Sequence, residues 1–119
     1  MRVGAVIEDL MLFSRIDAAA VDAGASLLRV GDPAELVADE PFDLVLVDWS
    51  ARRRDWAHVL ARLRDRTAAR VILFGRHTDL EAHASARAAG LGPMWARSKL
   101  VSELSSLLAS KGVRSTTDG

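Results

Sequence analysis

The stretch VGAVIED, at residues 3–9, sets an apolar run directly against two carboxylates. A second stretch, LVLVD at residues 44–48, repeats the arrangement with one aspartate. Continuous apolar runs of this length are typical of strands buried on both faces of a parallel sheet. If the two runs are neighbouring strands, Glu8, Asp9 and Asp48 meet at the carboxyl edge of the sheet, where open α/β folds bind ligands.

Short apolar runs alternate with helix-like segments along the rest of the chain. The runs predict strands at Arg2–Ile7, Ser26–Val30, Phe42–Val47, Arg70–Phe74 and Pro93–Ala96. The segments between and after them predict helices at Leu10–Ala23, at Pro33 to about Ala38 and around Asp55–Thr67. A fourth helix is predicted from a capping box that opens at Thr78 to Gly90, and a fifth at about Lys99–Ser110 with its end at Gly112. This alternation predicts an α/β fold, a doubly wound three-layer sandwich with a five-stranded parallel sheet and five helices.

The length of 119 residues suits one domain, for which we expect residues 1–112, followed by a flexible C-terminal tail at residues 113–119. The chain contains no long uncharged apolar run, so we expect neither a membrane span nor a signal peptide. It also contains no cysteine, which excludes disulfides and thiolate metal sites. The default expectation is a soluble intracellular protein.

The charges are segregated although the net charge is zero. Residues 1–50 carry three arginines and ten acidic residues, whereas residues 51–76 carry eight arginines and two acidic residues. The arginine-rich segment leaves open an arginine-dependent nucleic-acid-binding protein. Against this alternative, no tyrosine is present and the aromatic residues are not interleaved with the basic ones as in a stacking platform.

Over about residues 2–111 the chain resembles a response-regulator receiver domain. The resemblance rests on the acidic pair Glu8-Asp9, on FDLVLVD at residues 42–48, on RVILF at residues 70–74 and on AAG at residues 88–90. It implies a flavodoxin-like sheet of order 2-1-3-4-5 in a bacterial cytoplasmic protein of two-component signalling or a phosphorelay. It also implies Asp48 as the acceptor of a phosphoryl group from a histidine kinase, with Glu8, Asp9 and Asp48 as ligands of Mg²⁺.

The chain departs from the receiver pattern at the switch positions. Receivers carry a serine or threonine at the end of strand four, where this chain has Gly75. They carry a lysine, usually followed by proline, at the end of strand five, where this chain has Arg97-Ser98 and a lysine only at Lys99. The loop after the aspartate differs from that of receivers and has the sequence WSARRR at residues 49–54. The resemblance is therefore to a degenerate, atypical receiver.

The sequence leaves open three interpretations of the acidic cluster. The acids cap strand ends and the first helix, or they bind a metal without switching, or Asp48 is phosphorylated. Crowded carboxylates need a neutralising cation, and Arg97 is available to pair bidentately with Asp48. Because arginines compete for the same charge, we expect no required cofactor and only weak binding of Mg²⁺. Trp49 is expected over or beside this site.

We therefore expect a stand-alone, non-enzymatic signalling and protein-interaction module that lacks the normal phospho-switch residues. The alternative is a conventional response regulator phosphorylated on Asp48. No catalytic motif is present, and the three histidines have no metal-ligand spacing. By the resemblance, the partner is another signalling protein or a second copy of the chain, bound through helix four, strand five and helix five with Arg87, Trp95 and Lys99 as interface candidates.

Overall fold

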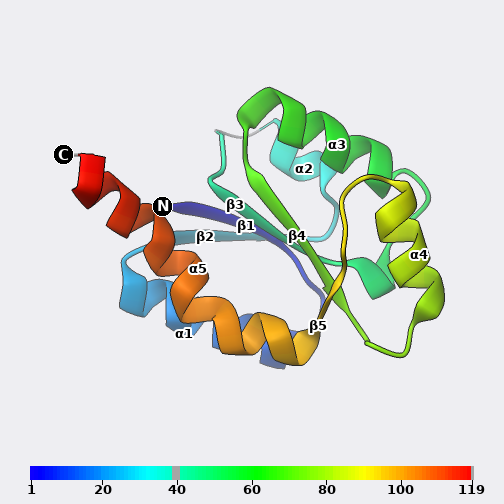
Figure 1. The fold of residues 1–119 in the computed structure, drawn as a ribbon, viewed down its shortest axis with the longest axis horizontal. Helices are drawn as coiled ribbons and strands as arrows, with labels where there is room; N and C mark the ends of the chain where they lie inside the picture. The colour runs from blue at the N-terminus through cyan, green and yellow to red at the C-terminus, as the bar shows by residue number, and fades with distance from the viewer. Residues whose placement is uncertain (39–40, 119) are drawn as a thin grey trace.

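The computed structural model describes residues 1–38 and 41–118 and shows the predicted α/β sandwich (Figure 1). Five parallel strands form one sheet of order β2-β1-β3-β4-β5, which confirms the flavodoxin-like topology. The strands are β1 (Arg2–Val6), β2 (Ser26–Val30), β3 (Leu44–Asp48), β4 (Arg70–Gly75) and β5 (Trp95–Ala96). The helices are α1 (Leu10–Ala23), α2 (Ala34–Val37), the 3-10 turn η1 (Trp49–Ala51), α3 (Trp56–Thr67), α4 (Leu80–Ala88) and α5 (Arg97–Asp118).

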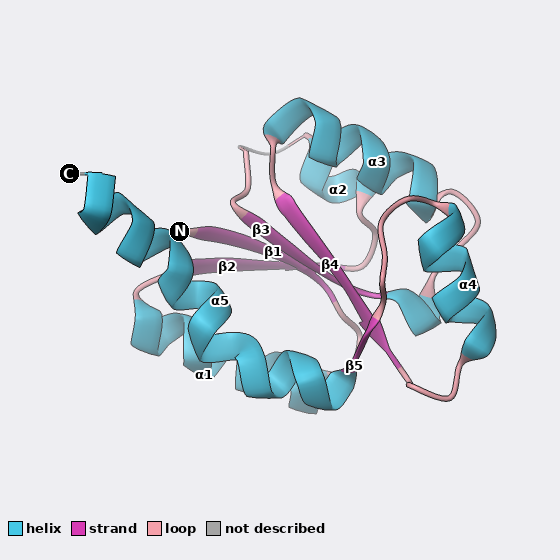
Figure 2. Cartoon of the chain, in the orientation of Figure 1, coloured by secondary structure: helices cyan, strands magenta, loops and turns pink. Residues whose placement is uncertain are grey.

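Helices cover both faces of the sheet (Figure 2). On one face α1 and α5 lie side by side, and their apolar residues, such as Ile16 and Leu100, share a buried cluster with Leu46 of β3. On the other face α2, α3 and α4 pack against Val45 and Val47, with Leu60 of α3 fully buried there. The strands are therefore apolar on both faces, as the continuous runs predicted.

The central strand β3 positions the candidate site. All five of its residues are buried, and its register pairs Val47 with Val6 of β1 and Asp48 with Phe74 of β4. Since β1 ends at Val6, the loop that carries Asp9 leaves the sheet next to Asp48. The predicted meeting of the two strand ends is therefore observed.

The last helix differs from its prediction at both ends. It begins at Arg97 instead of Lys99, directly after the two-residue strand β5. Its backbone is helical through Asp118, beyond Gly112, where the sequence predicted its end. A glycine inside a helix costs only about 1 kcal/mol relative to alanine, so Gly112 weakens the helix without ending it. The domain limits of 1–112 and the flexibility of 113–119 stay predictions.

The fourth helix also begins later than predicted. The sequence favoured a cap at Thr78, whereas the side chain of Asp79 accepts the hydrogen bond of the Ala82 amide and α4 starts at Leu80.

Within the residues that the structure describes, no helix combines the length and apolar character needed to cross a membrane.

Candidate functional site

A single guanidinium joins two of the three acids at the carboxyl edge of the sheet. Arg97, the first residue of α5, donates from Nη1 to Asp9 Oδ2 at 3.0 Å and from Nη2 to Asp48 Oδ2 at 3.2 Å. The Asp48 side chain is only 8% exposed, whereas those of Arg97 and Asp9 are 40% and 36% exposed. Arg97 thus pairs with Asp48 as predicted, but through one hydrogen bond instead of a bidentate pair, because its other amino group binds Asp9.

The second oxygen of each carboxylate is bound to backbone amides. Asp9 is the N-cap of α1, where Oδ1 accepts from the amides of Met11 and Leu12 at 3.0 and 3.2 Å. Asp48 caps η1, where Oδ1 accepts from the Ser50 amide at 3.2 Å. Each acid therefore caps a helix with one oxygen and binds Arg97 with the other.

In this arrangement Arg97 and backbone amides compete with a divalent cation for the carboxylate oxygens. Mg²⁺ needs carboxylate oxygens in near-octahedral geometry, and the oxygens of Asp9 and Asp48 already accept hydrogen bonds. Glu8 is exposed and lies outside the pair that Arg97 bridges. Across residues 1–38 and 41–118, no three histidine, cysteine or acidic side chains form a group that suits a metal. Weak Mg²⁺ binding by these residues stays a prediction.

The pKa values of the two bridged acids shift in opposite directions. Burial raises the pKa of Asp48 above its ordinary value of 3.8, and the charge of Arg97 and the Ser50 amide oppose that rise. The amide of Leu12, together with Arg97, lowers the pKa of Asp9. Ionised Asp48 is therefore costly to bury, and Arg97 is the cation that holds it at this edge.

Stability should depend on pH through Asp48. Because its folded pKa is raised, its contribution to stability is present at low pH and is lost as pH rises from about 4 through the folded pKa. We expect Asp48→Asn, which does not ionise, to gain stability relative to the parent protein over that window. Urea unfolding of both proteins between acidic and neutral pH measures the difference, and a difference that is flat with pH contradicts the assignment.

The Ser50 hydroxyl lies where a side chain at position 75 would project. Ser50 Oγ accepts the hydrogen bond of the Arg76 amide at 3.1 Å. A Cβ atom added to Gly75 would overlap this same oxygen and would lie 3.0 Å from Met94 Sδ. Position 75 is therefore glycine because the Ser50 side chain, from the loop after β3, occupies the space of a side chain on β4.

Ser50 also connects the site to α4. The Ala82 amide lowers the pKa of Asp79, the N-cap of that helix, and the nearby Ser50 hydroxyl lowers it further. The Ser50 amide binds Asp48, so one residue links the buried acid, the end of β4 and the start of α4. The sequence analysis named Ser50 only as part of a rewritten loop, because the register of β3 against β4 is needed to see what it replaces.

The remaining predicted residues lie away from this pair of acids. Ser98 and Lys99 follow Arg97 in α5 and are exposed, and the Lys99 ammonium lies 4.4 Å from the centroid of the Trp95 ring. Trp95 is half-buried on β5, and Arg87 is exposed in the last turn of α4. Lys99 therefore does not replace the lysine of receivers at the acidic site, since its ammonium lies over Trp95.

Comparisons with known proteins agree with this topology. The sequence matches no protein-family profile and no curated protein. Among solved structures, it is similar to a response-regulator receiver domain from Francisella, with 16% identity, a TM-score of 0.64, and coverage of 92% of this chain and 98% of that one. A CheY-like receiver domain from Methanospirillum hungatei gives 16% identity, a TM-score of 0.67, and coverage of 95% and 97%.

A phosphorylated cyanobacterial phytochrome response regulator, RcpA, is similar at 13% identity and a TM-score of 0.68, with 91% of each chain covered. At these sequence identities the similarity shows a shared backbone fold and does not extend to the residues of the site. The chain has the fold of response-regulator receiver domains.

Proposed function

We propose that this receiver-fold domain is a non-enzymatic protein-interaction module that transmits or scaffolds a signal without a phosphorylation switch. The observation that carries the proposal is the bridge from Arg97 to Asp9 and Asp48. A fixed guanidinium supplies the positive charge that the acids need, and it cannot be deprotonated. The positive charge that Arg97 brings to the site is therefore constant at neutral pH.

The chemistry at Asp48 supports the same view. To accept a phosphoryl group, one carboxylate oxygen must attack phosphorus, and both oxygens of Asp48 are held by hydrogen bonds. The developing charge also needs donors aimed at the phosphoryl oxygens. Gly75 offers no hydroxyl there, and the Ser50 hydroxyl already accepts the hydrogen bond of the Arg76 amide.

Incubation with acetyl phosphate and Mg²⁺, followed by intact mass, tests the proposal. We expect no stoichiometric adduct of about 80 Da on the parent protein, because Asp48 is held by Arg97. The Asp48→Ala variant is the control for labelling elsewhere. An adduct at full occupancy that disappears in Asp48→Ala would contradict the proposal and support a conventional response regulator in which Arg97 stands in for the lysine.

For the interaction itself, we propose the face made by α4, β5 and α5, with a second copy of the chain or another signalling protein as partner. At this edge of the sheet β5 is only two residues long. Beside it Trp95 lies against the Lys99 ammonium, and a cavity of about 330 Å³ is lined by these two residues and by others that include Arg70 and Leu107. An aromatic anchor with a charged rim is the composition expected of a binding surface.

Sedimentation velocity tests the face through a second copy. We expect the parent protein to self-associate at high micromolar concentration, and Trp95→Ala with Arg87→Glu to weaken association by about tenfold or more. The matched control is Arg15→Glu on α1, an exposed arginine on another helix, which should leave association unchanged. A parent protein that stays monomeric, or a control that weakens association equally, contradicts self-association through this face.

A further inference from the structure

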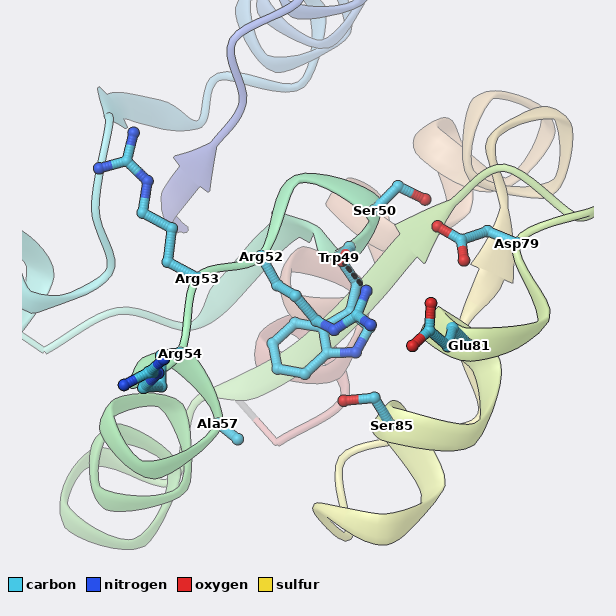
Figure 3. A pocket seen from close by; sticks show the side chains of 9 residues that line it. All are labelled: Trp49, Ser50, Arg52, Arg53, Arg54, Ala57, Asp79, Glu81 and Ser85. Carbon is cyan, nitrogen blue, oxygen red and sulfur yellow. Dashed lines mark hydrogen bonds between the residues drawn. The ribbon is translucent and has the colours of Figure 1, made fainter.

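A pocket of about 510 Å³ lies between the loop after β3 and the start of α4, beside the acidic site. The loop, with the first turn of α3, forms one wall, and the outer face of α4 forms the other (Figure 3). The lining residues are Trp49, Ser50, Arg52, Arg53, Arg54, Ala57, Asp79, Glu81 and Ser85. Its volume is within the range of small-molecule sites in proteins.

The two walls carry opposite charges. Arg52 is half-buried, its guanidinium carbon lies 5.9 Å from the centroid of the Trp49 ring, and its Nη1 donates to the Trp49 carbonyl at 3.1 Å. Figure 3 shows the carboxylates of Asp79 and Glu81 on the facing wall, whereas Arg53 and Arg54 point away from the space between. The pocket thus presents one inward cation opposite two carboxylates.

The inner wall contains a hydrogen-bond donor without an acceptor. Trp49 is 1% exposed, and its indole nitrogen has no hydrogen-bond partner within the described part of the chain. A buried donor left unsatisfied costs about 1–3 kcal/mol. In Figure 3 the indole lies beneath Arg52 and faces Glu81 and Ser85 across the pocket. A ligand acceptor would reach this donor only if Arg52, which lies against Trp49, moved aside.

We propose that this pocket binds a small zwitterion of the α-amino acid type, with a free carboxylate and a free ammonium. The planar fork of Arg52 suits a carboxylate, which would also accept the Trp49 indole hydrogen bond. Glu81 would bind the ammonium, because Asp79 already caps α4 by accepting the hydrogen bond of the Ala82 amide. A simple anion would face two carboxylates, and a simple cation would face Arg52.

The three tryptophan indole signals in an NMR spectrum of isotope-labelled protein provide the assay, with Trp49→Phe assigning the relevant one. The probes are pools of the standard L-amino acids, followed by the single amino acid that shifts the Trp49 signal most. Its N-acetyl derivative and its carboxamide each lack one charge. We expect each derivative to bind about tenfold or more weakly, which is about 1.4 kcal/mol.

Two charge-removing variants locate the site. Arg52→Gln and Glu81→Gln should each weaken binding by about tenfold, and Arg53→Gln is the matched control because Arg53 points away. Circular dichroism confirms that each variant is folded. No shift of the Trp49 signal with any pool at millimolar concentration would overturn the proposal. Equal binding of the N-acetyl derivative, or equal loss in Arg53→Gln, would overturn it as well.

Discussion

Replacing Arg97 with alanine is expected to lower the free energy of unfolding by about 2 kcal/mol. Breaking a buried ion pair usually costs more, but the Arg97 side chain is 40% exposed. Water can therefore replace part of the hydrogen bonding that Arg97 gives to the two acids. The main loss comes from Asp48, whose side chain is 8% exposed in the parent protein and would lose its cation. Urea unfolding measures the change.

Removing the charge of Asp48 should recover part of this loss. We expect the double variant Arg97→Ala with Asp48→Asn to be more stable than Arg97→Ala alone, since no charge is then left unpaired. Arg87→Ala is the matched control, because Arg87 is exposed on α4 and should change stability by no more than about 0.5 kcal/mol. If Arg97→Ala costs no more than Arg87→Ala, the bridge contributes nothing to the fold.

Placing a hydroxyl side chain at position 75, at the end of β4, should destabilise the protein. Gly75→Thr would place its Cβ on the Ser50 hydroxyl and 3.0 Å from Met94 Sδ, so the loop after β3 would have to move. Overpacking of this kind costs roughly 1–3 kcal/mol, and we expect the upper end because Gly75 is buried. Thermal and urea unfolding measure the loss.

The cause can be separated from a general intolerance of side chains. In a Ser50→Gly background, Gly75→Ala should cost less than it does in the parent protein, because the overlapping oxygen is gone. Gly31→Ala is the control, since the nearest atom to its added Cβ is Glu35 Oε2 at 4.0 Å. A Gly75→Thr protein as stable as the parent would show that Ser50 does not occupy this space.

The fold was predictable because its signals are local. Five apolar runs separated by helical segments leave few arrangements for the chain, and β2 and α1 have the predicted bounds. The weakest signals were at helix ends, where Asp79 rather than Thr78 caps α4 and Gly112 does not end α5. Helix ends depend on which side chain reaches the free amides, and several neighbouring residues can do so.

Site residues were predictable only where their position at the end of a strand determines which residues they meet. Asp48 ends β3 and Arg97 directly follows β5, so their pairing follows from the order of the strands. The role of Ser50 depends on a three-dimensional overlap with Gly75, and the pocket depends on which way Arg52 points. The sequence shows that these residues are present, but it contains no signal for the orientation of their side chains.

The central claim is that Arg97 already supplies the positive charge that a divalent cation would bring to Asp9 and Asp48. A Mg²⁺ titration, followed by the NMR signals of the Asp9 and Asp48 carboxyl carbons, tests it most directly. The predicted result is no saturable shift of either signal up to millimolar Mg²⁺ in the parent protein. A saturable shift of both carboxyl signals at sub-millimolar Mg²⁺, lost in Asp9→Ala, would show that the cation displaces Arg97 and would contradict the claim.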